Sequence, residues 1–188
     1  METRDPAPTP PPSPSPFDPS AVPGAAVGTT GYAKADLVKR FLAMLIDAVI
    51  AWVIALILGI GGTTLYGVGL LIGAGYILAR DGLSLDFADL RSVGKKFIKL
   101  RPVRLDGGAM DLNASIRRNW PLALGSVLWG IASMAGGAYM FFLAGLFGIL
   151  AWLGSLLGLV EGILVIVDQD GRRIGDKVAN TQVIETAE

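Results

Sequence analysis

The chain has 188 residues, of which 52% are hydrophobic and only 17% are charged, and its 16 basic residues balance its 16 acidic residues. It contains neither cysteine nor histidine, which excludes a disulfide framework, a thiolate nucleophile, a histidine base and a Cys/His zinc site. The apolar residues are gathered in long blocks, and this indicates that lipid is the solvent for much of the chain.

The N-terminal segment differs from the rest of the chain in composition. Residues 1–30 contain nine of the eleven prolines, mixed with Ser, Thr, Ala and Gly. Such a segment cannot bury enough apolar surface to offset the entropy lost on ordering. We therefore expect a disordered tail with polyproline II character, followed by a membrane domain over residues 31–185.

Two apolar segments follow and predict a helical hairpin. The first, about residues 36–59, is long enough to cross a bilayer. The second, about residues 63–79, is close to the lower limit of roughly 17 residues for a span. Glycines between the two segments favour a tight turn.

Residues 80–118 form a polar connector that is rich in Lys and Arg. We expect these basic side chains to lie at lipid headgroups, with an amphipathic surface helix over residues 83–98. A turn at Asp106 to Gly108 also predicts a short β-hairpin, formed by residues 97–105 and 109–112.

Residues 120–167 contain no basic residue and a single acid, Glu161, over a length that suits two spans. The predicted helices are about 120–144 and 147–167, with a turn near the glycines between them. The tail that follows contains a predicted short strand at 181–184.

The charges predict the topology. Every Lys and Arg lies outside residues 41–79 and 119–171. By the positive-inside rule, both termini and the connector are expected in the cytoplasm. The prediction is an all-α integral membrane protein, with four transmembrane helices as two hairpins joined by a polar cytoplasmic connector.

Two acidic residues lie inside the predicted spans. Asp47 follows Arg40 by seven residues, or about 10.5 Å along a helix, and Glu161 precedes Asp168 by the same interval. An acid in hydrocarbon costs roughly 2.5–3.5 kcal/mol, so each needs a partner, water or a function. We hypothesise that Asp47 and Glu161 hold a cation or share a proton.

A structural role is the alternative interpretation of Asp47. Its carboxylate would then form an ion pair with Arg40, or with Arg117 or Arg118 at the start of the third span, and would only fix the packing of the helices.

Five stretches of the sequence together resemble the RDD family of membrane proteins, which is named for an arginine and two aspartates. They are residues 40–47, 92–95, 101–107, 117–121 and 172–181. The resemblance covers about residues 34–185. It implies a bacterial membrane protein that transports ions or other ligands.

The resemblance also implies roles for particular residues. Arg40 and Asp47 match the arginine and the first aspartate, and Asp176 matches the second. The family often has a histidine before the second aspartate, where this chain has Gly175. Asp176 lies in the predicted cytoplasmic tail, from where it could fold back onto Arg40 or the connector.

Two functions remain open at this stage. In the first, the protein transports a cation, a proton or a small ligand through a site made of Arg40, Asp47, Glu161 and Asp176. In the second, it is a non-catalytic scaffold or accessory protein, in which Arg40, Asp47 and Asp176 are structural. No nucleophile or metal site for an enzyme stands out, and we expect no cofactor and no nucleic-acid partner.

The apolar segments and the family resemblance also predict where the protein lies and what it contacts. The protein should be a multi-pass component of a bacterial cell membrane, with membrane lipids as its partners. Four short helices make a thin bundle, and their glycine stripes would allow a homodimer.

Overall fold

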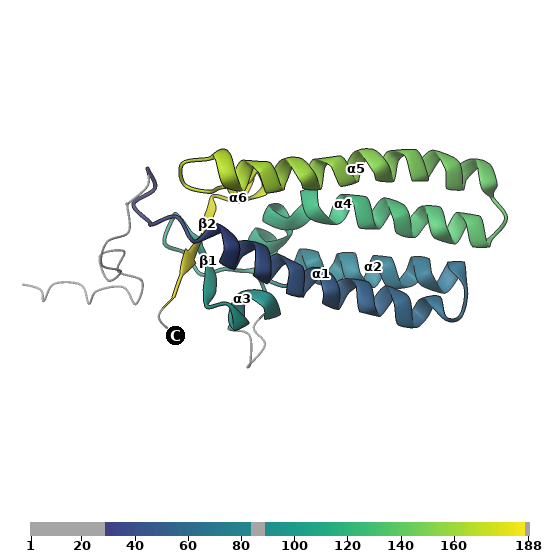
Figure 1. Ribbon diagram of the computed structural model, residues 1–188, viewed down its shortest axis with the longest axis horizontal. Coiled ribbons are helices and arrows are strands. Elements are labelled where there is room, and N and C mark those ends of the chain that lie inside the picture. The colour runs from purple at the N-terminus through teal and green to yellow at the C-terminus, as the bar shows by residue number, and fades with distance from the viewer. Residues whose placement is uncertain (1–28, 84–88, 187–188) are drawn as a thin grey trace, which may run out of the picture.

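The computed structural model describes residues 29–83 and 89–186. Four long helices lie side by side: α1 (Leu37–Gly59), α2 (Thr63–Ala79), α4 (Leu112–Gly137) and α5 (Phe141–Val167). Four short elements gather at one end of this bundle (Figure 1): α3 (Val93–Phe97), β1 (Leu100–Arg104), α6 (Ile174–Val178) and β2 (Thr181–Glu185). The chain is mostly helical, as the sequence predicts, with one small sheet.

Side-chain caps explain where two of the long helices begin. The Asp36 carboxylate accepts a hydrogen bond from the Lys39 amide at 2.9 Å, which caps α1. The Asp111 carboxylate accepts a hydrogen bond from the Ala114 amide at 2.6 Å, which caps α4. Each cap satisfies an amide that would otherwise have no intrahelical partner.

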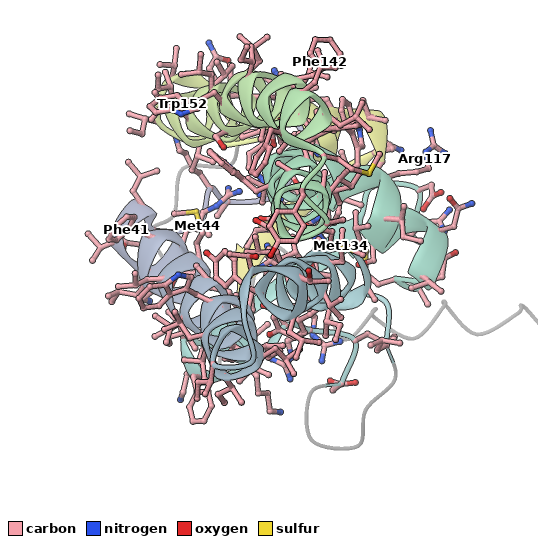
Figure 2. The ribbon with its side chains drawn as sticks, turned by 90° about the vertical axis from the view of Figure 1, so that its right-hand side faces the viewer. Phe41, Met44, Arg117, Met134, Phe142 and Trp152 are labelled. Carbon is pink, nitrogen blue, oxygen red and sulfur yellow. The ribbon has the colours of Figure 1, made fainter. Side chains whose placement is uncertain are left out.

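The outer surfaces of the bundle are apolar. α1 and α5 are each long and apolar enough to cross a membrane, and α2 is a shorter apolar helix of 17 residues. Large side chains such as Phe41, Phe142 and Trp152 project outward from these surfaces (Figure 2) and are 57%, 83% and 65% exposed. Apolar exposure on this scale suits contact with lipid rather than water.

Small residues let the helices pack closely in the order α1, α2, α4, α5. Gly69 of α2 faces the backbone of Ala55 in α1, and Gly125 of α4 faces the backbone of Ser155 in α5. The buried positions of the four helices are mainly alanine and glycine. Over the described residues, the outer helices α1 and α5 are not among the pairs of helices with extensive contact.

The β-hairpin predicted within the connector is wrong. β1 pairs antiparallel with β2 from the C-terminal segment, with Pro102 opposite Val183. The predicted second strand fails because residues after the turn lead into the Asp111 cap and then into α4. The strand predicted at 181–184 is confirmed, since β2 spans Thr181–Glu185.

The boundaries of the second hairpin also need correction. α4 begins at Leu112 rather than near Trp120, because the Asp111 cap starts the helix earlier. The turn between α4 and α5 lies at 138–140, where Tyr139 adopts a φ of 61°, rather than near 145–148. Gly145 and Gly148 stay inside α5.

Two other predictions fall wholly or partly outside the described residues. The disordered tail was predicted for residues 1–30, of which the structure describes only 29 and 30. The surface helix predicted over 83–98 includes residues 84–88, which are not described, and the part that follows contains only the short helix α3.

Close packing between α1 and α2 can be tested within one helix. A Cβ at Gly69 would lie 2.5 Å from the Ala55 Cα, whereas a Cβ at Gly75 would have no neighbour within 4 Å. We expect Gly69→Ala to cost about 1–3 kcal/mol and to lower the unfolding temperature in detergent. Gly75→Ala should leave it unchanged or raise it, because alanine favours the helix. Equal effects would contradict this packing.

Candidate functional site

A charged cluster lies where the four long helices meet the short elements. It contains five basic and four acidic side chains, each at most 10% exposed, which come from every part of the described chain. Its members are Arg40, Asp47, Arg80, Asp81, Lys95, Arg118, Glu161, Arg173 and Asp176. All four residues expected to form a site, Arg40, Asp47, Glu161 and Asp176, belong to this cluster.

Asp47 joins three helices. One carboxylate oxygen accepts hydrogen bonds from the Tyr76 hydroxyl at 2.8 Å and from the Gly94 amide at 2.9 Å. The other accepts from an Arg80 Nη at 2.9 Å. Gly94 can approach because it lacks a side chain: a Cβ there would lie 2.1 Å from the Ala43 carbonyl oxygen.

The partner of Asp47 is therefore Arg80, and not Arg40, Arg117 or Arg118 as the structural interpretation expected. Arg80 follows the last residue of α2, a helix that packs against α1 and brings this guanidinium to Asp47. A basic residue after α2 was visible in the sequence, but its distance from Asp47 depends on how the hairpin folds.

Asp176 gathers three guanidinium groups around one buried carboxylate. Arg118 Nη2 lies 2.8 Å away, Arg173 Nε 3.3 Å and Arg40 Nη2 3.4 Å. Burial alone would raise the pKa of Asp176, but the charges of Arg173, Arg118 and Arg40 hold this pKa well below its usual value. The second aspartate of the resemblance thus does fold back onto Arg40.

Glu161 is fully buried on α5 and faces α6. One carboxylate oxygen accepts a hydrogen bond from the Gly175 amide at 3.2 Å, and the other lies 3.7 Å from Arg173 Nε. Asp47 and Glu161 are therefore both buried at the same end of the bundle, but their basic neighbours differ: Asp47 pairs with Arg80, and Glu161 lies near Arg173, which also contacts Asp176. The hypothesis that Asp47 and Glu161 hold a cation or share a proton stays a prediction.

Asp81 and Lys95 were missed as site residues. Lys95 Nζ lies 2.6 and 2.8 Å from the two Asp81 oxygens, and Asn119 donates to the same carboxylate at 3.1 Å. Burial would raise the pKa of Asp81, but Lys95, Arg118 and Arg80 hold it well below its usual value. Lys95 was expected at lipid headgroups. The sequence signal for a buried partner is Asp81, an acid that stands almost directly after α2 and needs a counter-charge.

A cavity of about 370 Å³ opens beside the charged cluster, between α1 and α5. Its rim consists of apolar residues from these two helices, and several are exposed, including Val38 at 64% and Ile166 at 63%. Its buried part contains the apolar residues Ala43, Leu100 and Val183. It also contains six members of the charged cluster, which we call the floor: Arg40, Asp47, Arg80, Lys95, Arg118 and Arg173.

The floor of the cavity is basic. Of its six charged residues, only Asp47 is acidic, and Asp81, Glu161 and Asp176 do not line the cavity. Within the described residues, Arg118 Nη1 and Arg80 Nε have no hydrogen-bond partner, and Arg118 Nη2 has only its ion-pair contact with Asp176. Guanidinium N–H groups of this kind bind carboxylate and phosphate oxygens.

The ion pairs of Asp176 can be tested by removing one charge. Asp176→Asn would leave three buried guanidinium groups short of a counter-charge, which costs about 3–5 kcal/mol for a buried pair. We expect a lower yield and a lower unfolding temperature in detergent. Asp106→Asn is the control, because Asp106 forms an exposed pair with Arg104 and should change neither. Normal unfolding of Asp176→Asn would show that these contacts are not stabilising.

Comparison with known proteins agrees with the resemblance seen in the sequence. The model of the RDD family matches residues 34–180, a segment that contains all nine members of the charged cluster. No curated protein and no solved structure matches the chain. α1 and α5 have the length and hydropathy of membrane spans, which indicates a membrane protein. Because the matched segment covers most of the chain, the protein belongs to the RDD family.

Proposed function

We propose that this protein crosses a cell membrane four times and binds a small anion in the cavity. α1 and α5 supply two spans by length and hydropathy. α2 has 17 residues, close to the lower limit for a span. α4 completes the second hairpin with α5, and its residues after Arg118 carry no charge.

The proposed orientation follows from the basic residues. The turn after α1 and the turn after α4 contain no Lys or Arg, whereas the opposite end of the bundle carries all the basic residues that the structure describes. The positive-inside rule then puts the charged cluster and both termini in the cytoplasm of a bacterial cell. In this arrangement the cavity lies at the cytoplasmic end of the spans.

The basic floor of the cavity carries the proposal of an anionic ligand. Five basic residues and one acid line it, and both oxygens of that acid, Asp47, already accept hydrogen bonds from protein groups. A metal cation bound there would have to displace Arg80 and would face four other positive charges. Asp47 is better suited to hold Arg80 in the wall than to carry a cation.

The balance of charges in the cluster also favours an anionic ligand. The cluster holds five basic and four acidic groups, so it keeps one positive charge without a counter-ion when every group is ionised. Burial lowers the pKa of Lys95 to about 7, so this surplus is complete only below that pH. A bound anion would neutralise it in an environment where an unpaired charge is costly. Binding without chemical conversion is part of this proposal.

A structural role for Arg40, Asp47 and Asp176 is favoured by a separate observation. The contacts of Asp47 link α1 with α2 and α3, and those of Asp176 link α6 with α1 and α4. Removing either carboxylate would free several elements at once. Asp47 and Asp176 would therefore hold the binding site together, whereas Arg40 both pairs with Asp176 and lines the cavity.

Anion binding can be tested with inorganic phosphate. A ligand that binds only the folded state stabilises it, by about 2.7 kcal/mol when its concentration is 100 times the dissociation constant. This gain in the free energy of unfolding also raises the unfolding temperature. We expect purified protein to be stabilised by phosphate relative to chloride at equal ionic strength. Arg118→Gln should abolish the effect.

Arg117→Gln is the matched control, because Arg117 is the exposed neighbour of Arg118 and does not line the cavity. It should keep the phosphate response. Cation flux in proteoliposomes that depends on Asp47 and is lost in Asp47→Asn would contradict the proposal, and so would a phosphate response that survives in Arg118→Gln.

The proposed topology can be tested with single cysteines, because the natural chain has none. Ile60, in the turn after α1, is 88% exposed, and Asp106 lies in an exposed turn at the other end. We expect a membrane-impermeant thiol reagent to label Ile60→Cys in intact cells and Asp106→Cys only in inverted vesicles. Labelling of both from one side would exclude the four-span arrangement.

A further inference from the structure

We propose that the ligand of this cavity is an anionic lipid, which enters sideways between α1 and α5. This inference rests on the proposed function, because it assumes that the basic floor binds an anion. It adds the chemical class of the ligand, an oxyanion joined to an acyl chain, and the direction from which it comes.

The bundle is open where the cavity lies. The helices pack in the order α1, α2, α4, α5, so each outer helix has a close long-helix neighbour on one side only. Viewed along the bundle, α4 and α2 fill the middle, and Met44 lies in the space between α1 and α5 (Figure 2). The two helices beside this space, α1 and α5, are the two described helices that suit a bilayer best.

The charged residues of the cavity lie in its buried part, beside the apolar residues Leu100 and Val183, whereas the exposed residues of its lining are apolar. The rim consists of exposed apolar residues, with Val38 and Phe41 on α1 and Ile166 on α5 at 64%, 57% and 63%. The floor contains Asp47 and Arg118, which are at most 1% exposed. An anionic amphiphile would match this arrangement, with its acyl chain against the apolar rim and its oxyanion at the charged floor.

The donors for the oxyanion are already in place. Arg118 lines the floor, is fully buried and has a terminal nitrogen, Nη1, with no hydrogen-bond partner among the described residues. Its Nη2 and the ammonium of Lys95 are occupied on one side by Asp176 and Asp81. Those carboxylates lie outside the lining of the cavity and leave the basic groups to face it.

A lipid fits the rim better than a free ion does. A free phosphate would lose its hydration while passing exposed apolar side chains that offer no hydrogen bonds. An acyl chain would cover the same side chains and gain about 0.8 kcal/mol for each buried methylene. The volume of about 370 Å³ is within the usual size of small-molecule sites, and the remaining chain could extend into the bilayer.

The test uses the full chain in a mild detergent and counts bound molecules by native mass spectrometry. The probes are oleoyl-lysophosphatidic acid, lysophosphatidylcholine with the same chain, and inorganic phosphate. We expect one lysophosphatidic acid per chain, bound at least about ten-fold more tightly than either other probe, because only it combines a net negative charge with a chain.

Two variants separate the rim from the floor. Met44→Trp should fill the opening and weaken lysophosphatidic acid about ten-fold while phosphate binding stays, and Leu45→Trp is its matched control. Leu45 is the next residue on α1, has a similar exposure of 47% against 42%, and does not line the cavity. Arg118→Gln should remove the preference for lysophosphatidic acid over lysophosphatidylcholine.

Each other outcome is decisive. If phosphate binds as tightly as lysophosphatidic acid and Met44→Trp changes neither, the lipid inference is wrong and the proposed anion site stands. If neither anion binds to a folded protein, both proposals fail. Equal binding of the two lysolipids, or equal losses in Met44→Trp and Leu45→Trp, would indicate unspecific adhesion to the apolar surface and overturn the inference.

Discussion

The structure depends on neutralising ionised side chains that are held away from water. An ion in a low-dielectric interior loses several kcal/mol of solvation, which only close counter-charges and hydrogen bonds offset. The protein meets this requirement by concentrating its buried charges at one end of the bundle. Asp176 has three guanidinium neighbours, and Asp47 accepts hydrogen bonds from three groups: Tyr76 in α2, Arg80 directly after it and Gly94 in α3.

This requirement explains the small elements outside the spans. α3 supplies the Gly94 amide to Asp47 and the Lys95 ammonium to Asp81. α6 supplies Asp176 and the Gly175 amide, and it reaches α4 only because Gly175 has no side chain: a Cβ there would lie 1.9 Å from the Arg118 carbonyl oxygen. The pairing of β1 with β2 ties the segments that carry α3 and α6 to each other. The segments outside the long helices therefore act as a scaffold for the charges.

The parts of this fold that depend on local sequence were predictable. The two apolar segments and the glycines between them predicted α1 and α2 almost to the residue, and the strand predicted at 181–184 corresponds to β2. Asp47 and Glu161 were predicted to need a partner, water or a function because each stands in an apolar segment, and both are buried. The contact of Asp176 with Arg40 followed from the family resemblance rather than from spacing.

Partner choice was not predictable, because it depends on how distant segments meet. Arg80 pairs with Asp47 across 33 positions, and β1 pairs with a strand near the end of the chain rather than with its neighbour. Lys95 carries no local mark that separates a buried lysine from one at a headgroup. The start of α4 was misjudged because polar residues in its first turns argue against a membrane span, although Asp111 caps them into the helix.

The surplus positive charge connects stability with ligand binding. A protein with one buried basic group in excess is less stable than its fully neutralised form, so an anion that completes the cluster binds and stabilises through the same interactions. Because Arg118 contacts Asp176, and Asp176 holds α6 against α1 and α4, the ligand would act on the contacts that order the charged end of the bundle. A lipid anion arriving between α1 and α5 would then couple the composition of the membrane to the order of that end, with the charged cluster as the connecting element.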